Sequence, residues 1–232
     1  MSAPAVSTPA SWREIPAGIV ERDWQVAAYH VQRGAELPPF DTAIQYLLAA
    51  EGLYKRSRSP YFEACVPLMH WRRRLPGLTP VRAGVTLHIP RLPGRWLAWA
   101  LEAARRVCGA GPCELLLQVV VRRGQVVIDL PAQQATATHL AFAHAPGSVL
   151  CDLHSHHELP ACFSSLDDQD ETGLRFYAVM GHIFSCPTLR MRVGVYGDRM
   201  QVPVTTLFES AGSFADACAE VQPSSANQAS HG

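Results

Sequence analysis

The sequence of 232 residues is poor in lysine, in net charge and in long apolar runs. Lys55 is its only lysine, and 20 basic residues balance 20 acidic ones, so the formal net charge at neutral pH is zero. This balance argues against a nucleic-acid-binding protein that works through general basicity, because such proteins neutralise phosphates with an excess of Lys and Arg. The short basic run at residues 72–74 is interpreted as a solvated loop.

Segments that would direct the chain to a membrane are also missing. No apolar run approaches the roughly 20 residues that a transmembrane helix needs. The first residues show no basic stretch followed by an apolar core, as a secretory signal would. The seven cysteines are scattered without a C-x-x-C pair, which fits thiols in a reducing compartment better than a disulfide framework. We therefore expect a cytoplasmic protein with no nucleic-acid or membrane partner.

Composition divides the chain into four segments. Hydrophobic residues make up 48% of it, enough for a sizeable core. Residues 1–12 are expected to be disordered and residues 212–232 to form a flexible tail, since both are rich in small and polar residues. Residues 13–92 are interpreted as a small N-terminal α+β module. Its pattern predicts strands over 25–31 and 81–89 and a short helix over 41–50 that begins at Asp41.

A clearer unit is expected over residues 93–211. Apolar residues from Trp96 to Cys108 recur at helical spacing, and Gly109 ends the helix. The pattern predicts a second, short helix over 164–172, and a hairpin turn at Arg123-Gly124. Buried strands are predicted over 114–121, 125–130, 148–156, 176–184 and 188–196. This order of elements predicts an α/β (α+β) sandwich around a mixed β-sheet.

The segment His154-Ser155-His156 carries the candidate chemistry. Side chains at i and i+2 of a strand point to the same face, so two imidazoles can share one ion. After seven intervening residues the chain reaches Ser164, and Asp167 follows in the first turn of the predicted helix. Two nitrogens and one carboxylate leave a fourth tetrahedral position open, which is typical of a catalytic zinc site.

Hydrolysis at such a site also needs a group that moves a proton. Glu114 is the candidate, because it stands at the head of an apolar strand where a buried carboxylate is costly without a purpose. Ser164 is the candidate hydrogen-bond donor to a developing oxyanion. Simpler interpretations exist: the S-x-x-D spacing of Ser164 and Asp167 is also that of a helix-capping box, and Glu114 can be a carboxylate in water. The combination favours a hydrolase.

The combination H-x-H-x7-S-x-x-D, with a glutamate 40 residues before its first histidine, resembles the JAMM motif of the JAB/MPN metalloprotease family. Members are zinc peptidases that cleave isopeptide or peptide bonds after ubiquitin-like proteins. The resemblance covers residues 93–209 and implies a JAB/MPN-type sandwich. It also implies that His154, His156 and Asp167 bind Zn²⁺. Ser164 then supports the tetrahedral intermediate and Glu114 is the acid–base residue.

A closer similarity is to the bacterial family of PRTRC system A proteins. It rests on the phrases ACFSS at 161–165, DDQDE at 167–171 and RVGVYG at 192–197. That family belongs to a cassette that also encodes ubiquitin-like, activating-enzyme-like and conjugating-enzyme-like proteins. The resemblance implies a ubiquitin-like partner and its conjugates, and leaves other cassette proteins open as partners. His157 stands where many eukaryotic JAMM members have proline, a departure that concerns the substrate loop.

Two other hypotheses stay open. One is a non-catalytic scaffold of the MPN type, against which the complete set of motif residues speaks. The other is a zinc hydrolase of small peptide or amino-acid conjugates, which the sequence does not separate from the peptidase.

Overall fold

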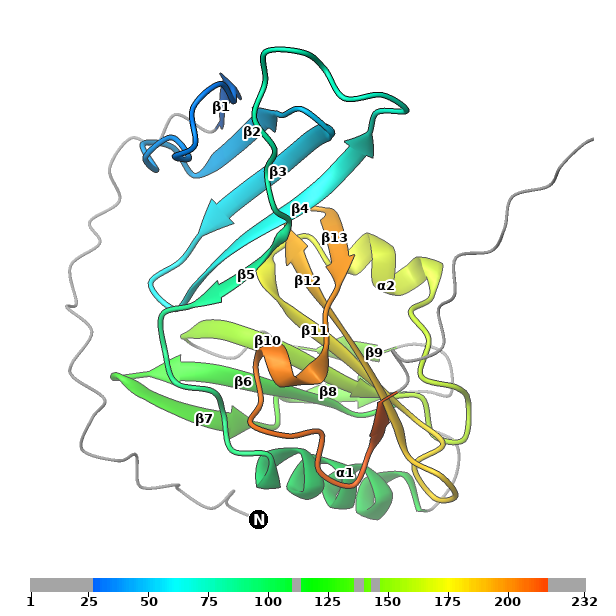
Figure 1. The fold of residues 1–232 in the computed structure, drawn as a ribbon. Coiled ribbons are helices and arrows are strands. Elements are labelled where there is room, and N and C mark those ends of the chain that lie inside the picture. The colour runs from blue at the N-terminus through cyan, green and yellow to red at the C-terminus, as the bar shows by residue number, and fades with distance from the viewer. Residues whose placement is uncertain (1–26, 110–113, 136–139, 143–146, 217–232) are drawn as a thin grey trace, which may run out of the picture.

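A computed structural model describes residues 27–109, 114–135, 140–142 and 147–216 (Figure 1). In that part of the chain, one five-stranded sheet precedes one seven-stranded sheet. The first sheet is built, in spatial order, from β1 (Ala27–Val31), β2 (Ile44–Leu48), β3 (Gly52–Arg58), β4 (Phe62–His70) and β5 (Gly84–Leu87).

The seven-stranded sheet follows the order β13-β12-β11-β10-β6-β7, and β14 pairs with β12. Its strands are β6 (Leu116–Arg122), β7 (Gln125–Asp129), β10 (Ser148–Ser155), β11 (Leu174–Gly181), β12 (Thr188–Val195), β13 (Asp198–Gln201) and β14 (Ala215–Asp216). The remaining elements are α1 (Arg95–Cys108), α2 (Ser165–Asp170), the 3-10 turn η1 (Val204–Thr206) and the small β8 (Gln133–Ala135) and β9 (Leu140–Phe142) pair. Because β10 runs parallel to β11 but antiparallel to β6, the sheet is mixed.

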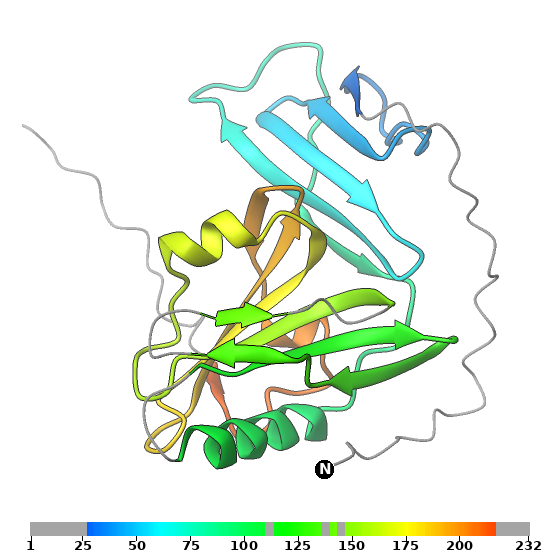
Figure 2. The ribbon, with the colours of Figure 1, turned by 180° about the vertical axis from the view of Figure 1, so that it is seen from behind.

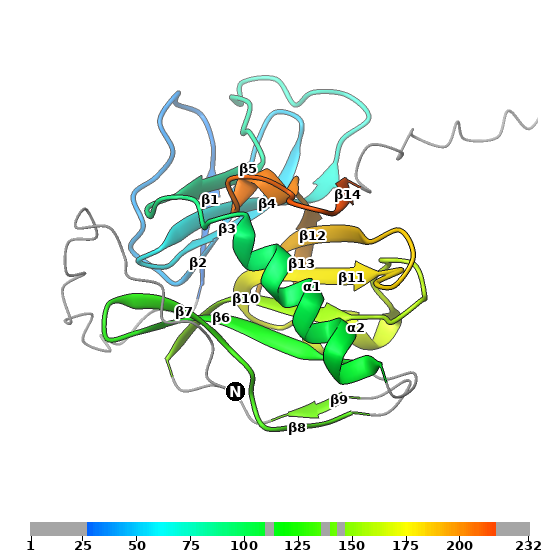
Figure 3. The ribbon, with the colours of Figure 1, turned by 90° about the horizontal axis from the view of Figure 1, so that it is seen from below.

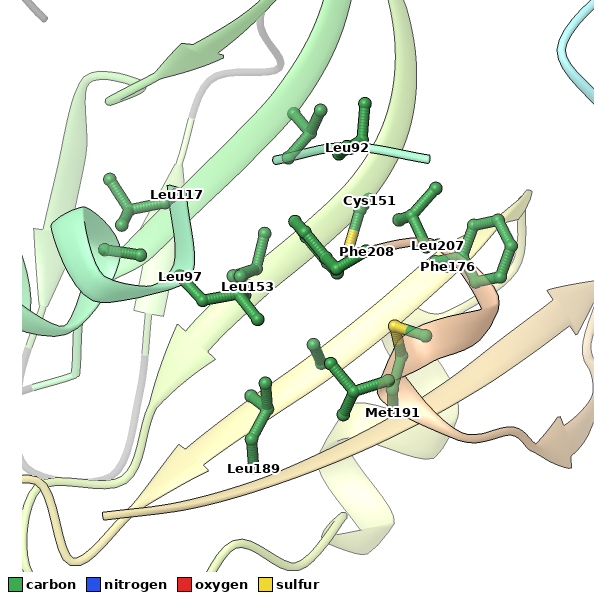
Figure 4. Packing of buried hydrophobic residues seen from close by; sticks show 14 of the residues in the cluster. Leu92, Leu97, Leu117, Cys151, Leu153, Phe176, Leu189, Met191, Leu207 and Phe208 are labelled. Atoms are coloured by element: carbon green, nitrogen blue, oxygen red, sulfur yellow. The ribbon is translucent and has the colours of Figure 1, made fainter. Parts of the chain in front are cut away.

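Helix α1 covers one face of the seven-stranded sheet (Figure 3). Its apolar stripe, which includes Leu97 and Ala100, is buried. Every second residue of the central strands points into the same core, for example Leu153 of β10 and Met191 of β12 (Figure 4). This alternation follows from the period of two along a strand, and it leaves the opposite face of the sheet for polar residues.

The two large sheets share this core. Phe62 of β4 packs against Phe176 of β11, with ring centroids 4.8 Å apart. Lys55 of β3 is buried, and its ammonium donates to the Tyr196 carbonyl at 2.7 Å and to the Asp198 carboxylate at 3.0 Å. Figure 2 shows the first sheet lying against the β12 and β13 end of the second one.

Several predicted elements are confirmed. Helix α1 begins within one residue of the predicted start and ends at Cys108. The β6–β7 hairpin turns at Arg123 and Gly124, whose φ angles of 50° and 75° are those that a tight hairpin turn requires. The mixture of helices with mixed sheets makes the chain an α+β protein, as expected.

The helix predicted over 41–50 is wrong, because this segment contains strand β2. The strand lies between β1 and β3, and it alternates buried and half-buried residues, so the pairing partners decide its conformation. The Asp41 carboxylate, which was expected to cap the helix, accepts a hydrogen bond from Gln45 Nε2 at 3.0 Å. Among the described residues of the N-terminal segment, all regular elements are strands.

The two ends of the chain are described only in part. Residues 1–12 and 217–232 lie outside the described residues. From the segment expected to be a tail, Ala215–Asp216 form β14 and pair with Thr188 and Leu189 of β12. Neither helix in the described ranges has the length and apolar character needed to cross a membrane.

The packing of α1 gives a first prediction. Leu97→Ala removes a fully buried side chain, and we expect it to lower the free energy of unfolding by about 2–5 kcal/mol, because a cavity remains. Val107→Ala on the same helix is the matched control, since Val107 is 49% exposed, and its effect should stay within about 0.5 kcal/mol. Urea unfolding followed by circular dichroism measures both. Equal losses in the two variants would contradict the placement of α1.

Candidate metal centre

The register of β10 decides where the two histidines point. Cys151 and Leu153 lie in the core beneath α1, so Asp152 and His154 lie on the opposite face of the sheet. The strand ends at Ser155, and the His156 amide continues the pairing by donating to the Met180 carbonyl at 2.7 Å. His156 therefore follows the same alternation, as the sequence predicts.

The loop after His156 is fastened to the connection between β11 and β12. The Ile183 amide donates to the His157 carbonyl at 3.0 Å, and the Glu158 carboxylate accepts from the Phe184 amide at 2.7 Å. Gly181 allows the close approach, since a Cβ atom there would collide with backbone atoms of the loop at residues 160–161. The loop thus returns the chain to the histidine face along a defined path.

Helix α2 begins with the capping box that the sequence allowed. Ser164 is its N-cap, and the Asp167 amide donates to Ser164 Oγ at 3.2 Å. In return, the Ser164 amide and hydroxyl donate to Asp167 Oδ2 at 2.6 and 2.7 Å. These bonds occupy one carboxylate oxygen of Asp167 and leave Oδ1 directed at the histidines. The role of Ser164 as an oxyanion donor stays a prediction.

His154, His156 and Asp167 meet at one point. His154 Nε2 lies 3.1 Å from His156 Nε2 and 3.2 Å from Asp167 Oδ1, and the candidate ligand atoms of the three residues all lie within 4.8 Å of one another. Two ligands bound at 2.0–2.1 Å to a tetrahedral ion lie roughly 3.3 Å apart. The two measured separations agree with this value, so the donor set fits a divalent cation.

Hydrogen bonds alone cannot satisfy all the nitrogen and oxygen atoms that face one another at this point. A single N–H on His154 Nε2 can be directed at Asp167 or at His156, but not at both. His156 also forms a hydrogen bond with the backbone of Pro160, whose carbonyl can only accept, so a proton sits on the imidazole edge turned to Pro160. One cation among the three would satisfy the lone pairs that converge here, and these residues could hold a metal ion.

The protonation states favour cation binding. Burial lowers the pKa of His156, and neighbouring His154 lowers it further. For Asp167, burial acts to raise the pKa, but hydrogen bonds from His154 and Ser164 outweigh this effect and hold it well below its usual range. At neutral pH the imidazole of His156 is therefore neutral and the carboxylate of Asp167 is ionised, as metal ligands must be.

A cleft of about 170 Å³ opens beside the three residues. Glu114 lines it together with His154 and Asp167. Its lining is completed by Leu116, Asp152, Leu166, Asp170, Glu171, Thr172, Gly173, Arg175 and Tyr177. The structure thus brings two of the candidate ligands, His154 and Asp167, to one cleft with the candidate acid–base residue, and His156 contacts His154 beside it.

Glu114 was predicted to stand at the head of a strand. In the structure it lies two residues before β6 begins. The pairing with β10 nevertheless extends toward it. Leu116 is opposite His154, and Leu115 exchanges hydrogen bonds with Ser155 through the Ser155 amide at 3.0 Å and the Ser155 hydroxyl at 3.1 Å. Continued by two residues, this antiparallel register places Glu114 opposite His156, which explains why Glu114 lies at the cleft.

Sequence reasoning missed the charged residues on the sheet face next to the ligands. Asp152 accepts from Gln118 Nε2 at 2.8 Å and pairs with Arg175 at 3.1 Å. Glu171 pairs with Arg192 at 2.5 Å, and burial raises the pKa of Glu171 to about 7. Strand alternation puts Asp152 on the same face as His154, and this was a signal in the sequence. The arginines that pair with Asp152 and Glu171 lie on β11 and β12, and no signal in the sequence indicated these pairs.

Comparisons with protein families and with curated proteins found no relative of this chain: no family model matches it, and no curated protein matches it.

The pKa shifts predict how metal binding depends on pH. With Zn²⁺ as the probe ion, the affinity should be nearly constant from pH 8 to pH 7, because the lowered pKa of His156 keeps its imidazole neutral there. The affinity should fall only at a pH below the ordinary histidine pKa of about 6.5, where protons begin to compete for the imidazole of His156. Competition with a chromophoric chelator, corrected for its own titration, measures this. A steady decline between pH 8 and pH 7 would contradict the assignment.

Proposed function

We propose that this protein is a zinc-dependent peptidase or isopeptidase of the JAB/MPN type. The observation that carries the proposal is the convergence of His154, His156 and Asp167 at separations that suit a tetrahedral ion. It lies beside a cleft that His154 and Asp167 line together with Glu114. Three protein ligands of the His₂Asp kind leave a position open, which suits catalysis better than a structural role. A purely non-catalytic scaffold has no need to keep this donor set together.

The residues divide the chemical work. Zinc, when bound, supplies Lewis acidity that polarises a carbonyl and lowers the pKa of water to about 7. Glu114 takes the proton of the attacking water and returns it to the departing nitrogen, a task for a carboxylate in the cleft that is not a ligand. The Ser164 amide and hydroxyl keep Asp167 oriented. The hydroxyl has one proton, which would turn from Asp167 to the oxyanion when Ser164 acts as the proposed donor.

The proposed substrate is the C-terminal tail of the ubiquitin-like protein of the same cassette, joined to another protein or peptide. This part of the proposal rests on the resemblance of the motif and its surroundings. An extended tail needs only a narrow channel to reach the ligands, and the cleft of about 170 Å³ offers room for a short stretch of backbone. The proposed fold is the JAB/MPN sandwich over residues 93–211, with the N-terminal sheet packed on it.

The first test is metal content. Purified protein reconstituted with Zn²⁺ should hold about one ion per chain, since one set of three ligands converges among the described residues. His154→Ala and Asp167→Ala should each lose most of it. Elemental analysis after dialysis gives the stoichiometry, and His30→Ala, a change in the other sheet, serves as control. Zinc-free wild type, or full binding in both ligand variants, would refute the site.

The second test concerns turnover. Glu114→Gln should keep zinc and fold but lose at least about a hundredfold in rate, the lower end of what general acid–base catalysis contributes. The substrate is the neighbouring gene's ubiquitin-like protein fused through its C-terminus to a fluorescent protein, and cleavage is followed by electrophoresis. Glu102→Gln is the matched control, because Glu102 lies on α1, on the far side of the sheet from the cleft. Near-normal cleavage by zinc-loaded Glu114→Gln would remove Glu114 from the mechanism.

A further inference from the structure

We propose that Arg192 is a positioning residue of the metal centre, which holds α2, and with it Asp167, at the distance that metal binding requires. The inference concerns the same site as the proposed function and rests on its ligand assignment. Arg192 lies on β12, 25 positions after Asp167 in the sequence. Neither the motif nor its spacing includes it.

Helix α2 has no apolar anchor of its own. It spans only six residues, and none of its side chains is buried. Leu166, its one large apolar residue, is 41% exposed. A helix this short is not stable by itself, and most helical stability in proteins comes from packing of an apolar face. Something other than the hydrophobic core must therefore fix the position of Asp167.

Arg192 supplies the missing anchor through three contacts. Its Nε donates to Glu171 Oε2 at 2.5 Å, directly after the helix. Its Nη2 lies 2.8 Å from Asp168 Oδ1, in an ion pair whose angles are not those of a hydrogen bond. The ring of Phe163, directly before the N-cap, covers the guanidinium with its centroid 3.7 Å from Cζ. The three contacts lie on both sides of Asp167 along the chain.

Arg192 is itself held firmly. Its residue is 8% exposed, and β12 pairs with β11 on one side and with β13 on the other. A planar guanidinium can serve two carboxylates and an aromatic face at once, whereas an ammonium cannot reproduce this fork. Arg199 of β13 also contacts α2, through the Asp168 carbonyl at 2.7 Å, but it does not reach Glu171. Arg192 alone among these residues joins both ends of the helix to the sheet.

Removal of this guanidinium should release α2. Glu171 is 4% exposed, so without Arg192 its carboxyl group would be buried without its partner, and the helix end would move toward water. Asp167 would then lose its fixed separation from His154, which is now 3.2 Å. Partners that orient metal ligands contribute about 10- to 100-fold to metal affinity in general.

The experiment compares Arg192→Met, Arg192→Lys and the control Arg190→Met, with two readouts. Arg190 lies on the same face of the same strand and makes none of the three contacts described above. In zinc-free protein, Arg192→Met should speed hydrogen exchange at the amides of residues 164–171, while the amides of α1 exchange as in wild type. In the zinc competition assay it should weaken binding about 10- to 100-fold. Arg192→Lys should give an intermediate loss, and Arg190→Met none.

A double variant separates positioning from a general loss of stability. Arg192→Met combined with Glu171→Gln removes the buried carboxyl group that has lost its partner, so it should recover thermal stability but not zinc affinity. Full recovery of zinc affinity, or unchanged exchange at residues 164–171 in Arg192→Met, would overturn the role of Arg192. Since the exchange readout needs no metal, it stands even if wild type binds no zinc, a result that would refute the proposed function instead. Arg192→Lys keeps the charge and gives the comparison if Arg192→Met fails to fold.

Discussion

The pairing of β10 with β6 and β11 is the constraint on which the rest of the structure depends. A strand with neighbours on both sides cannot rotate, and its side chains must alternate between the two faces of the sheet. In β10 this alternation sends Cys151 and Leu153 into the core under α1, and Asp152 and His154 to the other side. A shift of the register by one residue would turn the histidine into the apolar core and the leucine to the side of the candidate ligands. The formation of the core therefore also sets the geometry of the candidate metal centre.

The two faces of the seven-stranded sheet are stabilised by different physical means. Beneath α1 the contacts are apolar, and burial of side chains such as Phe176 and Phe208 provides the driving force. On the opposite face, α2 and its flanks are attached by charges, among them the pairs of Arg192 with Glu171 and Asp168. Directional contacts of this kind fix a position more closely than they stabilise a fold, because desolvation offsets much of their gain. Such an attachment suits a short helix that presents the Asp167 carboxylate to the two histidines.

Much of the candidate site could be predicted from sequence because it is built from local rules. Strand alternation placed His154 and His156 on one face, and the spacing from Ser164 to Asp167 indicated a cap that the structure contains. Helix α1 was equally predictable, since its apolar stripe and terminal glycine are local signals. Glu114 was predicted on a strand but lies before β6, where the extended chain pairs through the Ser155 side chain and Glu114 lines the cleft.

The features that the sequence did not predict share one cause: contacts between segments far apart in the sequence determine them. Residues 41–50 have the pattern of a short helix, yet β1 and β3 draw them into a sheet. The partners of Arg192 and Arg175 depend on strand order in the seven-stranded sheet, and no local pattern encodes that order. The same holds for the packing of Phe62 on Phe176, which joins two segments that the sequence suggested were separate units.

The contact between Lys55 and the turn before β13 has a consequence for the chemistry of the protein surface. Each of the other basic residues is an arginine, and the Lys55 ammonium is enclosed and bonded to Tyr196 and Asp198. The folded protein therefore offers no lysine amine for acylation, because an amine must shed its proton and meet an electrophile in the open to react. Conjugating enzymes that form amide bonds with lysine find no acceptor side chain here.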